Sequence, residues 1–575
     1  MSLQIPVPEP GLSENGGRFA DGCDPHLIAF DVDGIQEYLF QSVLLRVIAG
    51  ASAVIANADE ELARRARKRG GTVIVSTGGI GLLQFDQRES AQQFADSFSQ
   101  WYRNETLSGS VAASAPIQVV NSRGFSTAAS AAFESLEKQK RAGRREKPEN
   151  SMPQGRVCES CGSEMSSVRM NFGTRQSPDL KWIGPVCLHK FHSRDRHGWQ
   201  DWCRTFTPED SSLHEFWNRD CSSPTTFPRD FNNLAGNGML GLVVADADGT
   251  GRLLRRLAES NADHETWRAF SEGLRTLTRS SLAAAINHVI AGEIAGASQQ
   301  SVFPVMPLFC GGDDFVIACR GDLALELAAE LCISFSDSEK PWCPGHQLGL
   351  SAAVVVTHPG FPFRNAHRIA SQLLRNAKRA AVRERWREAG CGAIDFALIS
   401  ESTADADTIV RDRTIVNSSR TQAIEFSGRP YRAARSGYRS IGGFLNVCRW
   451  LVNTPDSGLG NSRLHELREV CSRTRWETLV PALKADKGLG VEEFLQVLGE
   501  VTNDFQDWTR RTTRQPHAKA SVRKILEMLG MSGNAEQVIA EDPENDAGGR
   551  SFRSLVGDLA DGLALIPGLK AADRR

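Results

Sequence analysis

Four residues near the middle of the chain, Gly311 to Asp314, have the types needed for divalent-metal chemistry on a triphosphate. Apolar segments flank them on both sides, Phe303 to Cys310 before and Phe315 to Cys319 after. This pattern predicts a β-hairpin whose tip reads GGDD. Gly311 and Gly312 would let the hairpin turn tightly and let a triphosphate approach the backbone.

A second pair of carboxylates ends an earlier apolar segment, Leu242 to Asp248 (LVVADAD), which reads as a strand. If this strand lies beside the hairpin, Asp246 converges with Asp313 and Asp314. Mg²⁺ and Mn²⁺ prefer oxygen ligands, and two such ions about 3.5 to 4 Å apart catalyse nucleotidyl transfer. We therefore predict a metal centre at these three aspartates. Asp248, two residues beyond Asp246, is either a further metal ligand or part of the turn.

An isolated GGDD would be no more than a turn, because glycine and aspartate are common turn residues. A duplicated unit argues for chemistry instead. His26 to Asp33 (HLIAFDVD) is again an apolar strand ending in two aspartates, and two short strands then flank the tip Gly78 to Gly81. The same order of strand, helix, hairpin, helix and strand therefore occurs twice. The first tip reads GGIG, so we predict that the second copy is the catalytic one.

These motifs resemble those of a known family. Asp246-Ala-Asp248-Gly249-Thr-Gly251, followed by GGDD, resembles the second palm of the large Csm/Cmr polymerase-cyclase subunit of type III CRISPR-Cas effector complexes. The segment Asp31 to Phe40 (DVDGIQEYLF), followed by Gly50-Ala51-Ser52, is similar to the first palm of that family, whose metal acids are degenerate. The resemblance covers about residues 26 to 430.

The resemblance implies that the second palm converts ATP to cyclic oligoadenylates in antiviral defence, and that the first palm supplies a second nucleotide pocket. It implies nucleotide binding by Gly249, Gly251, Gly311 and Gly312. Lys378, on a basic helix over Asn365 to Arg387, would contact the triphosphate. The implied partners are other type III effector subunits, guide RNA and target RNA.

Many members of the family begin with an HD nuclease domain. We expect none here, because about 25 residues precede the first palm strand and no His-Asp dipeptide occurs. Two other functions stay open. A diguanylate-cyclase-like enzyme is one, because GGDDF differs from GGDEF by one carboxylate, although Gly249 to Arg252 replace the residues usual after the first motif. The other is a catalytically silent scaffold that binds guide and target RNA.

A zinc site is predicted between the two copies. Cys158-Glu-Ser-Cys161 is a CxxC knuckle, and Cys187 follows at a separation typical of paired knuckles. The family pattern would repeat CxxC after Cys187, but position 190 is lysine. We therefore assign the fourth ligand to His189, with His192 and Cys203 as alternatives. Four protein ligands leave no open position for water, which makes this Zn²⁺ structural. The cationic run from Lys138 to Lys147 is read as a solvated helix end without a role in the site.

The whole chain has 575 residues, a formal net charge of -2 and 41% hydrophobic residues, with no stretch long enough to span a bilayer. We expect a cytoplasmic α+β protein with two ferredoxin-like palm domains, a zinc-binding insert and a C-terminal helical domain. The expected parts are a flexible tail (1–24), the first palm (25–125), a helical linker and zinc-binding segment (126–225), the catalytic second palm (226–425) and the C-terminal domain (426–575).

Overall fold

The computed structural model gives the positions of most residues between 25 and 454 and of a few short segments beyond. The described residues are 25–120, 124–142, 155–173, 175–196, 227–260, 262–294, 302–343, 345–399, 406–411, 413–416, 422–425, 427–454, 466, 516–529, 540–541, 550–553 and 558–559. No helix in these ranges is both long and apolar enough to cross a membrane. The expected tail, residues 1–24, lies outside them.

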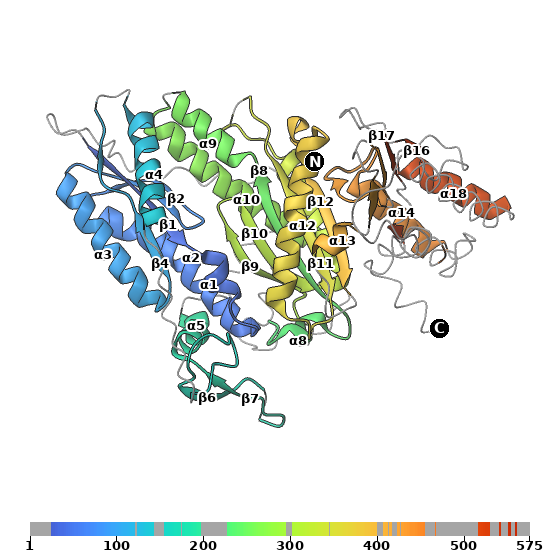
Figure 1. The fold of residues 1–575 in the computed structure, drawn as a ribbon, viewed down its shortest axis with the longest axis horizontal. Helices are drawn as coiled ribbons and strands as arrows, with labels where there is room; N and C mark the ends of the chain where they lie inside the picture. Colours follow the sequence, from blue (N-terminus) through green and yellow to red (C-terminus); the bar gives the residue numbers. More distant parts are fainter. Residues whose placement is uncertain are drawn as a thin grey trace.

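The first palm (blue, Figure 1) is a sheet covered by helices on both faces. Its elements are β1 (His26–Asp33), α1 (Ile35–Phe40), α2 (Leu45–Lys68), β2 (Thr72–Thr77), β3 (Ile80–Phe85), α3 (Arg88–Thr106), β4 (Ser110–Ala113), β5 (Ile117–Gln118) and α4 (Phe125–Ala142). The strand order is β2-β3-β1-β4, with β5 also on β1. Successive β1 side chains point to opposite faces, so Leu27 packs with α4 and Ile28 with α3. This is the ferredoxin-like order.

The second palm repeats this order and extends it. Its elements are α8 (Phe231–Ala235), β8 (Leu240–Asp248), α9 (Thr250–Glu259), α10 (His264–Ile294), β9 (Val305–Gly311), β10 (Asp314–Arg320), η1 (Gly321–Leu323), α11 (Ala324–Asp337), β11 (Gly349–Thr357), α12 (Phe363–Arg383), η2 (Trp386–Ala389), β12 (Ala393–Ile399) and β15 (Tyr431–Arg432). The sheet order is β15-β12-β11-β8-β10-β9. All residues of β11 are buried, because α11 and α12 pack against this strand. The mixed α+β class and the palm fold are confirmed.

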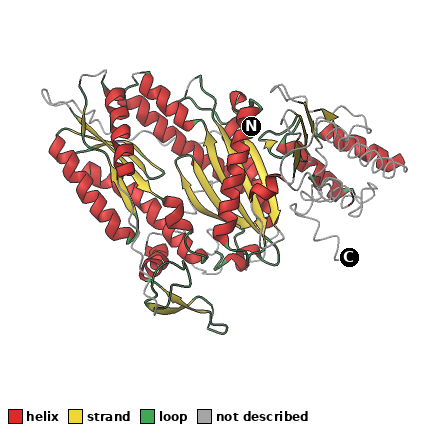
Figure 2. Cartoon of the chain, in the orientation of Figure 1, coloured by secondary structure: helices red, strands yellow, loops and turns green. Residues whose placement is uncertain are grey.

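The two palms pack so that a helix of each contacts a strand of the other. Helix α2 of the first palm contacts β9, and α10 of the second palm contacts β2. Figure 2 shows helices between the two sheets. Ser52 Oγ, on α2, donates a hydrogen bond to the backbone O of Leu308 on β9. The hairpins β2–β3 and β9–β10 are thereby brought face to face.

The insert between the two palms lies below the first palm in Figure 1 and contains β6 (Val168–Asn171), β7 (Leu180–Ile183) and α5 (Pro185–Arg196). Helix α5 lies directly against α2: a Cβ on Gly50 would be only 1.6 Å from the backbone O of Lys190. Gly50 is therefore the residue that allows the close approach of the two helices.

The described part of the C-terminal region contains helices α14 (Ile441–Asn453) and α18 (Pro516–Met528), as expected. It also contributes β16 (Ala540–Glu541) and β17 (Arg550–Arg553), which the sequence analysis did not predict. These pair in the order β13-β14-β17-β16 with β13 (Thr414–Val416) and β14 (Gln422–Glu425), which follow α13 (Ala406–Arg411). The C-terminal region is thus not purely helical.

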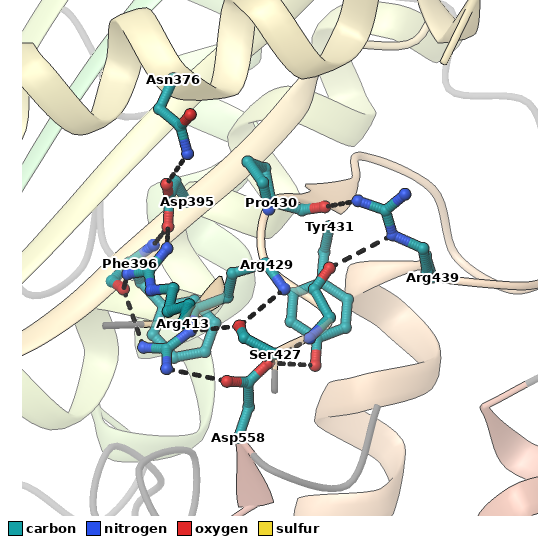
Figure 3. Close-up of polar contacts among 11 residues, drawn as sticks. Asn376, Asp395, Phe396, Arg413, Ser427, Arg429, Pro430, Tyr431, Arg439 and Asp558 are labelled. Carbon is teal, nitrogen blue, oxygen red and sulfur yellow. Dashed lines mark hydrogen bonds and ion pairs between the residues drawn. The ribbon is translucent and has the colours of Figure 1, made fainter. Parts of the chain in front are cut away.

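A buried polar network ties this region to the second palm (Figure 3). Asp395, on β12, accepts hydrogen bonds from Arg413 Nη1 at 2.6 Å and Asn376 Nδ2 at 2.8 Å. Asp558 forms an ion pair with Arg429 at 2.8 Å and accepts from the Tyr431 hydroxyl at 2.8 Å. Both carboxylates are fully buried, so each depends on its protein partners for charge compensation.

Candidate metal and nucleotide site

Three aspartates converge where β8 meets the β9–β10 hairpin. In the antiparallel ladder Asp314 lies directly opposite Asp246, and Gly311 pairs with Asp314 across a two-residue loop. Asp313, in that loop, accepts a hydrogen bond from Ala247 N through its backbone O at 3.1 Å. One carboxylate oxygen from each of Asp246, Asp313 and Asp314 lies within 4.8 Å of the others. The structure therefore brings together the three acids that the sequence singled out.

The electrostatics of this centre favour a bound cation. Burial, and then the charges of Asp246 and Asp313, raise the pKa of Asp314 to about 8. Burial also raises the pKa of Asp246 to about 6, against the opposing charge of Lys378. Crowded carboxylates resist ionisation unless a positive charge compensates them. Hard divalent ions such as Mg²⁺ or Mn²⁺ fit this all-oxygen donor set.

Lys378 lies at the acids themselves. From α12 its ammonium forms an ion pair with Asp246 and donates a hydrogen bond to the backbone O of Ala247 at 3.2 Å. The family resemblance implies that this lysine contacts the nucleotide. Its position beside the carboxylates places a positive charge where a phosphate bound at this centre would need one.

Asp248 has a different environment from the other three acids. It is buried, and Ser351 Oγ on β11 donates to its carboxylate at 2.6 Å. Burial raises its pKa, whereas the hydrogen bond from Ser351 and the charges of Lys378, Arg387 and Arg252 lower it. The close group of metal-binding oxygens consists of Asp246, Asp313 and Asp314 and does not include Asp248. The hydrogen bond between Asp248 and Ser351 therefore joins the end of β8 to β11.

The start of α9 offers an anion site next to these acids. Gly249 has a φ of 104° at the N-cap, and a Cβ there would lie 3.0 Å from Arg387 Nη2. A Cβ on Gly251 would meet nothing within 4 Å, so the space in front of this first helical turn is open. Backbone N–H groups at a helix N-terminus attract phosphates. Arg387, which sequence reasoning missed, adds a positive charge there.

The first palm has a matching arrangement of strands, but its hairpin turn carries no acids. Val32 N donates to the backbone O of Gly79 at 2.9 Å, as Ala247 N does to Asp313, and Asp31 lies opposite Ile80. Gly79 and Ile80 therefore stand at the positions of Asp313 and Asp314. Gly78 therefore corresponds to Gly312 in the structure, whereas aligning the letters GGIG with GGDD would pair Gly78 with Gly311.

Lys140 is the first-palm counterpart of Lys378. From α4 its ammonium forms an ion pair with the Asp31 carboxylate. Nothing local in the sequence indicates that α4 ends beside β1, so the run containing Lys140 was expected to be a solvated helix end without a role in the site. Lys140 compensates the charge of Asp31, and the residue opposite Asp31 on β3 is Ile80 instead of a second carboxylate.

We expect Asp31→Ala to keep metal-dependent turnover within an order of magnitude of wild type, because Asp31 has a partly exposed lysine partner, and pairs of this kind contribute little stability. Turnover should be measured at saturating Mg²⁺ beside Asp246→Ala, its structural counterpart. Equal losses in the two variants would mean that the active copy is assigned wrongly.

The insert between the two palms brings three of the four predicted zinc ligands together. Sulfur atoms of Cys158, Cys161 and Cys187 lie within 4.8 Å of one another and of a Glu164 carboxylate oxygen. Three thiols and a carboxylate are a donor set that suits Zn²⁺. The Glu164 carboxylate also accepts from the backbone N of Val186 and of Cys187, each at 3.0 Å, at the start of α5.

The predicted fourth ligand, His189, is not part of this group. Its Nε2 lies 2.6 Å from the backbone O of Glu105 on α3. Of the alternatives, His192 is exposed and absent from the group, and Cys203 lies outside the described residues. Lys190 points away to Tyr38, donating to its backbone O at 2.7 Å. Glu164, three residues after Cys161, occupies the fourth position and was missed.

Cys158→Ser is expected to lower the zinc content and to destabilise the insert, because metal binding and folding are coupled in such sites. Elemental analysis and thermal unfolding would measure both effects. His192→Ala is the matched control and should change neither. Well-folded wild-type protein without zinc would contradict the metal assignment.

A cavity of about 690 Å³ lies between the palms, next to the hairpin tip. Its lining includes Arg275 and Arg279 of α10, Asp59 of α2, and the turn residues Gly311 and Gly312. Burial raises the pKa of Asp59 to about 6, while the backbone N–H groups of Gly79 and Gly78 and the charges of Arg275 and Arg279 oppose this rise. The cavity is large enough for a small ligand and is lined by both palms.

Part of the second palm is similar to a known family. Residues 239–386 match the family model described as Cas10/Cmr2, second palm domain. No curated protein matches the chain. Solved Csm1-Csm4 cassettes are similar: one in complex with cA4 (15% identity, TM-score 0.38, 63% of this chain and 54% of that chain), an apo form (16%, 0.40, 64% and 55%) and one with AMPPNP (15%, 0.39, 66% and 55%).

The chain thus spans about half the length of the chains it matches. The family match covers β8, the β9–β10 hairpin, β11 and α12 of the second palm. It contains Asp246, Asp313, Asp314 and Lys378. In agreement with the resemblance in the motifs, residues 239–386 of this protein are similar to the second palm domain of Cas10/Cmr2.

Proposed function

We propose that this protein is a nucleotidyltransferase that joins ATP into cyclic oligoadenylates. One observation carries the proposal: Asp246, Asp313 and Asp314 present carboxylate oxygens within 4.8 Å of one another inside a Cas10/Cmr2-type second palm. Raised carboxylate pKa values at Asp246 and Asp314 add support, because such values cluster at functional sites. The choice of adenosine nucleotides follows the family resemblance.

In this mechanism Asp246, Asp313 and Asp314 would hold two divalent ions. When bound, such ions lower the pKa of an attacking hydroxyl and stabilise charge on the triphosphate. A ribose 3′-hydroxyl loses its proton to solvent and attacks the α-phosphorus in line. As the new O–P bond forms, the bond from the α-phosphorus to the oxygen that bridges to the β-phosphorus breaks, and pyrophosphate leaves with that oxygen. The N-terminus of α9, Arg387 and Lys378 bind phosphate oxygens and orient them.

The cavity between the palms is the best candidate for the nucleotide that supplies the 3′-hydroxyl. It reaches the Gly311–Gly312 turn, so a nucleotide held there would lie beside the metal centre. Arg275 and Arg279 are one helical turn apart on α10 and provide positive charge for its phosphates. The first palm would then contribute a binding wall rather than catalytic acids.

The same proposal covers the partners and the setting. The protein would act in the cytoplasm within a type III CRISPR effector complex, with other effector subunits, guide RNA and target RNA, in antiviral defence. Zn²⁺ at Cys158, Cys161 and Cys187 would stabilise the insert against α2 and would take no part in the transfer reaction.

Incubation with each labelled NTP tests the proposal. Purified protein is mixed with Mg²⁺ or Mn²⁺, with and without its guide complex and target RNA, and the products are analysed by mass spectrometry. Cyclic adenylates formed from ATP alone are the expected result. Cyclic dinucleotides from GTP would indicate a diguanylate-cyclase-like enzyme, and a complete lack of product in the assembled complex would favour the RNA-binding scaffold.

A further inference from the structure

The turns of the two hairpins touch each other backbone to backbone. Gly78 of the first palm has a φ of 61° and Gly312 of the second palm a φ of 62°. A Cβ on Gly78 would lie 2.8 Å from Gly312 N and 2.9 Å from the carbonyl carbon of Gly311. A Cβ on Gly311 would in turn lie 3.0 Å from the Cα of Gly78. No side chain fits between these turns, so their spacing is set by main-chain contact.

The first-palm turn is itself held in place from α2. Asp59 Oδ1 accepts the backbone N–H of Gly79 at 3.1 Å, and Ser76 Oγ donates to the backbone O of Asp59 at 3.0 Å. The opposite side of this turn is fixed to β1, where Val32 N donates to the backbone O of Gly79 at 2.9 Å. The turn therefore presents a fixed surface to Gly311 and Gly312.

The catalytic turn has supports of its own on two other sides. Thr278 Oγ1, on α10, lies 2.8 Å from the backbone O of Gly312. The backbone O of Asp313 accepts Ala247 N from β8 at 3.1 Å. Gly78 closes the remaining side, next to the residue that precedes Asp313. A shift of Gly312 therefore changes the distance of the Asp313 carboxylate from Asp246.

We propose that the Gly78–Gly79 turn of the first palm is a positioning element for the catalytic turn, and that Asp59 is the positioning residue that holds it. This inference rests on the proposed function for its kinetic consequence. It assigns the first palm, whose hairpin turn carries no carboxylate, a defined task in catalysis, which is to fix the position of the GGDD turn. Neither Gly78 nor Asp59 belongs to the carboxylate cluster of Asp246, Asp313 and Asp314.

Gly78→Ala is the direct test, because it forces a methyl group into the backbone of Gly311 and Gly312. Gly70→Ala is the matched control: Gly70 has a φ of 76°, lies in the same palm just before β2, and a Cβ there meets nothing within 4 Å. Both variants carry the same kind of backbone strain. We expect kcat to fall on the order of 10- to 100-fold in Gly78→Ala only, with little change in the KM for ATP.

Two further measurements keep the inference testable if Gly78→Ala folds poorly or if no product is found. Mn²⁺ affinity, measured by titration calorimetry on the full chain, should fall in Gly78→Ala and not in Gly70→Ala, whatever the reaction is. Asp59→Ala should resemble Gly78→Ala, whereas Asp59→Asn, whose amide oxygen can still accept from Gly79, should recover most of the loss. Mn²⁺ affinity and kcat that are equal in Gly78→Ala and Gly70→Ala, or unchanged in Asp59→Ala, would overturn the proposal.

Discussion

Alanine at both Asp313 and Asp314 is expected to abolish metal-dependent product formation and to leave the protein folded. The two residues supply two of the three clustered carboxylates, and metal stabilisation of the reacting charges contributes several kcal/mol. Each 1.36 kcal/mol corresponds to a tenfold change in rate, so the loss should be at least about 10³-fold.

The fold should survive because the Asp314 carboxylate opposes folding when no cation is bound. The pKa of Asp314 is raised to about 8, which means that the folded state disfavours its charged form. Above the ordinary aspartate pKa, removing this carboxyl therefore removes a destabilising contribution, fully so above about pH 8. Thermal unfolding at pH 8.5 should give a midpoint equal to or above that of wild type in the absence of metal.

Asp337→Ala is a suitable control for the double variant, because Asp337 is an exposed acid at the end of α11. Its product yield, measured by mass spectrometry at saturating Mg²⁺ and ATP, should match wild type. Near-normal product formation by the Asp313→Ala, Asp314→Ala protein would show that the chemistry takes place elsewhere.

The second large effect is expected at the network that joins the C-terminal region to the second palm. Asp395→Ala would leave Arg413, a residue that is only 8% exposed, without the carboxylate that lies 2.6 Å from its Nη1. Burial lowers the pKa of Arg413 and the charge of Asp395 opposes that shift, so Asp395 compensates the buried positive charge of the arginine. Breaking one side of a buried ion pair costs about 3 to 5 kcal/mol.

Urea denaturation followed by tryptophan fluorescence would measure this loss as a lower unfolding midpoint. Asp395→Leu combined with Arg413→Met removes both charges and should restore part of the stability, since an apolar pair leaves no buried charge uncompensated. Asp407→Ala, an exposed acid on α13, is the control that should have little effect. A midpoint for Asp395→Ala equal to that of this control would mean that the network does not stabilise the junction.

The palm folds could be predicted from the sequence because their signals are local. Apolar strands that end in aspartates, and glycine-led hairpin tips, recur in the same order in both copies. In a ferredoxin-like sheet this order determines which strands are adjacent, so the convergence of Asp246 with Asp313 and Asp314 could be predicted from the sequence. The pairing of Asp314 opposite Asp246 bears out this part of the reasoning.

Features that depend on distant pairings could not be predicted. Spacing places Asp248 on the same strand face as Asp246, but its partner Ser351 comes from β11, about a hundred residues away. Lys140 meets Asp31 across a similar separation. Glu164 was overlooked because it lies beyond the CxxC pattern and is positioned by the first turn of α5. Strand β17 pairs with β14 across more than 120 residues, and nothing in either short segment indicates this.

The backbone of the first-palm turn has a consequence for anyone who wishes to build a second active centre into this protein. Gly79 occupies the position of Asp313, but its φ is 84°, and a Cβ there would lie 3.1 Å from the Cβ of Val32. Among the described non-glycine residues a positive φ occurs only at Leu107, Arg385 and Arg439, so Asp313 has no such constraint. Writing GGDD over residues 78–81 would also misplace an acid at Gly81, where a Cβ meets Leu62 Cδ2 at 2.6 Å. A second active centre in the first palm would therefore require a different conformation of the Gly78–Gly79 turn before carboxylates are introduced.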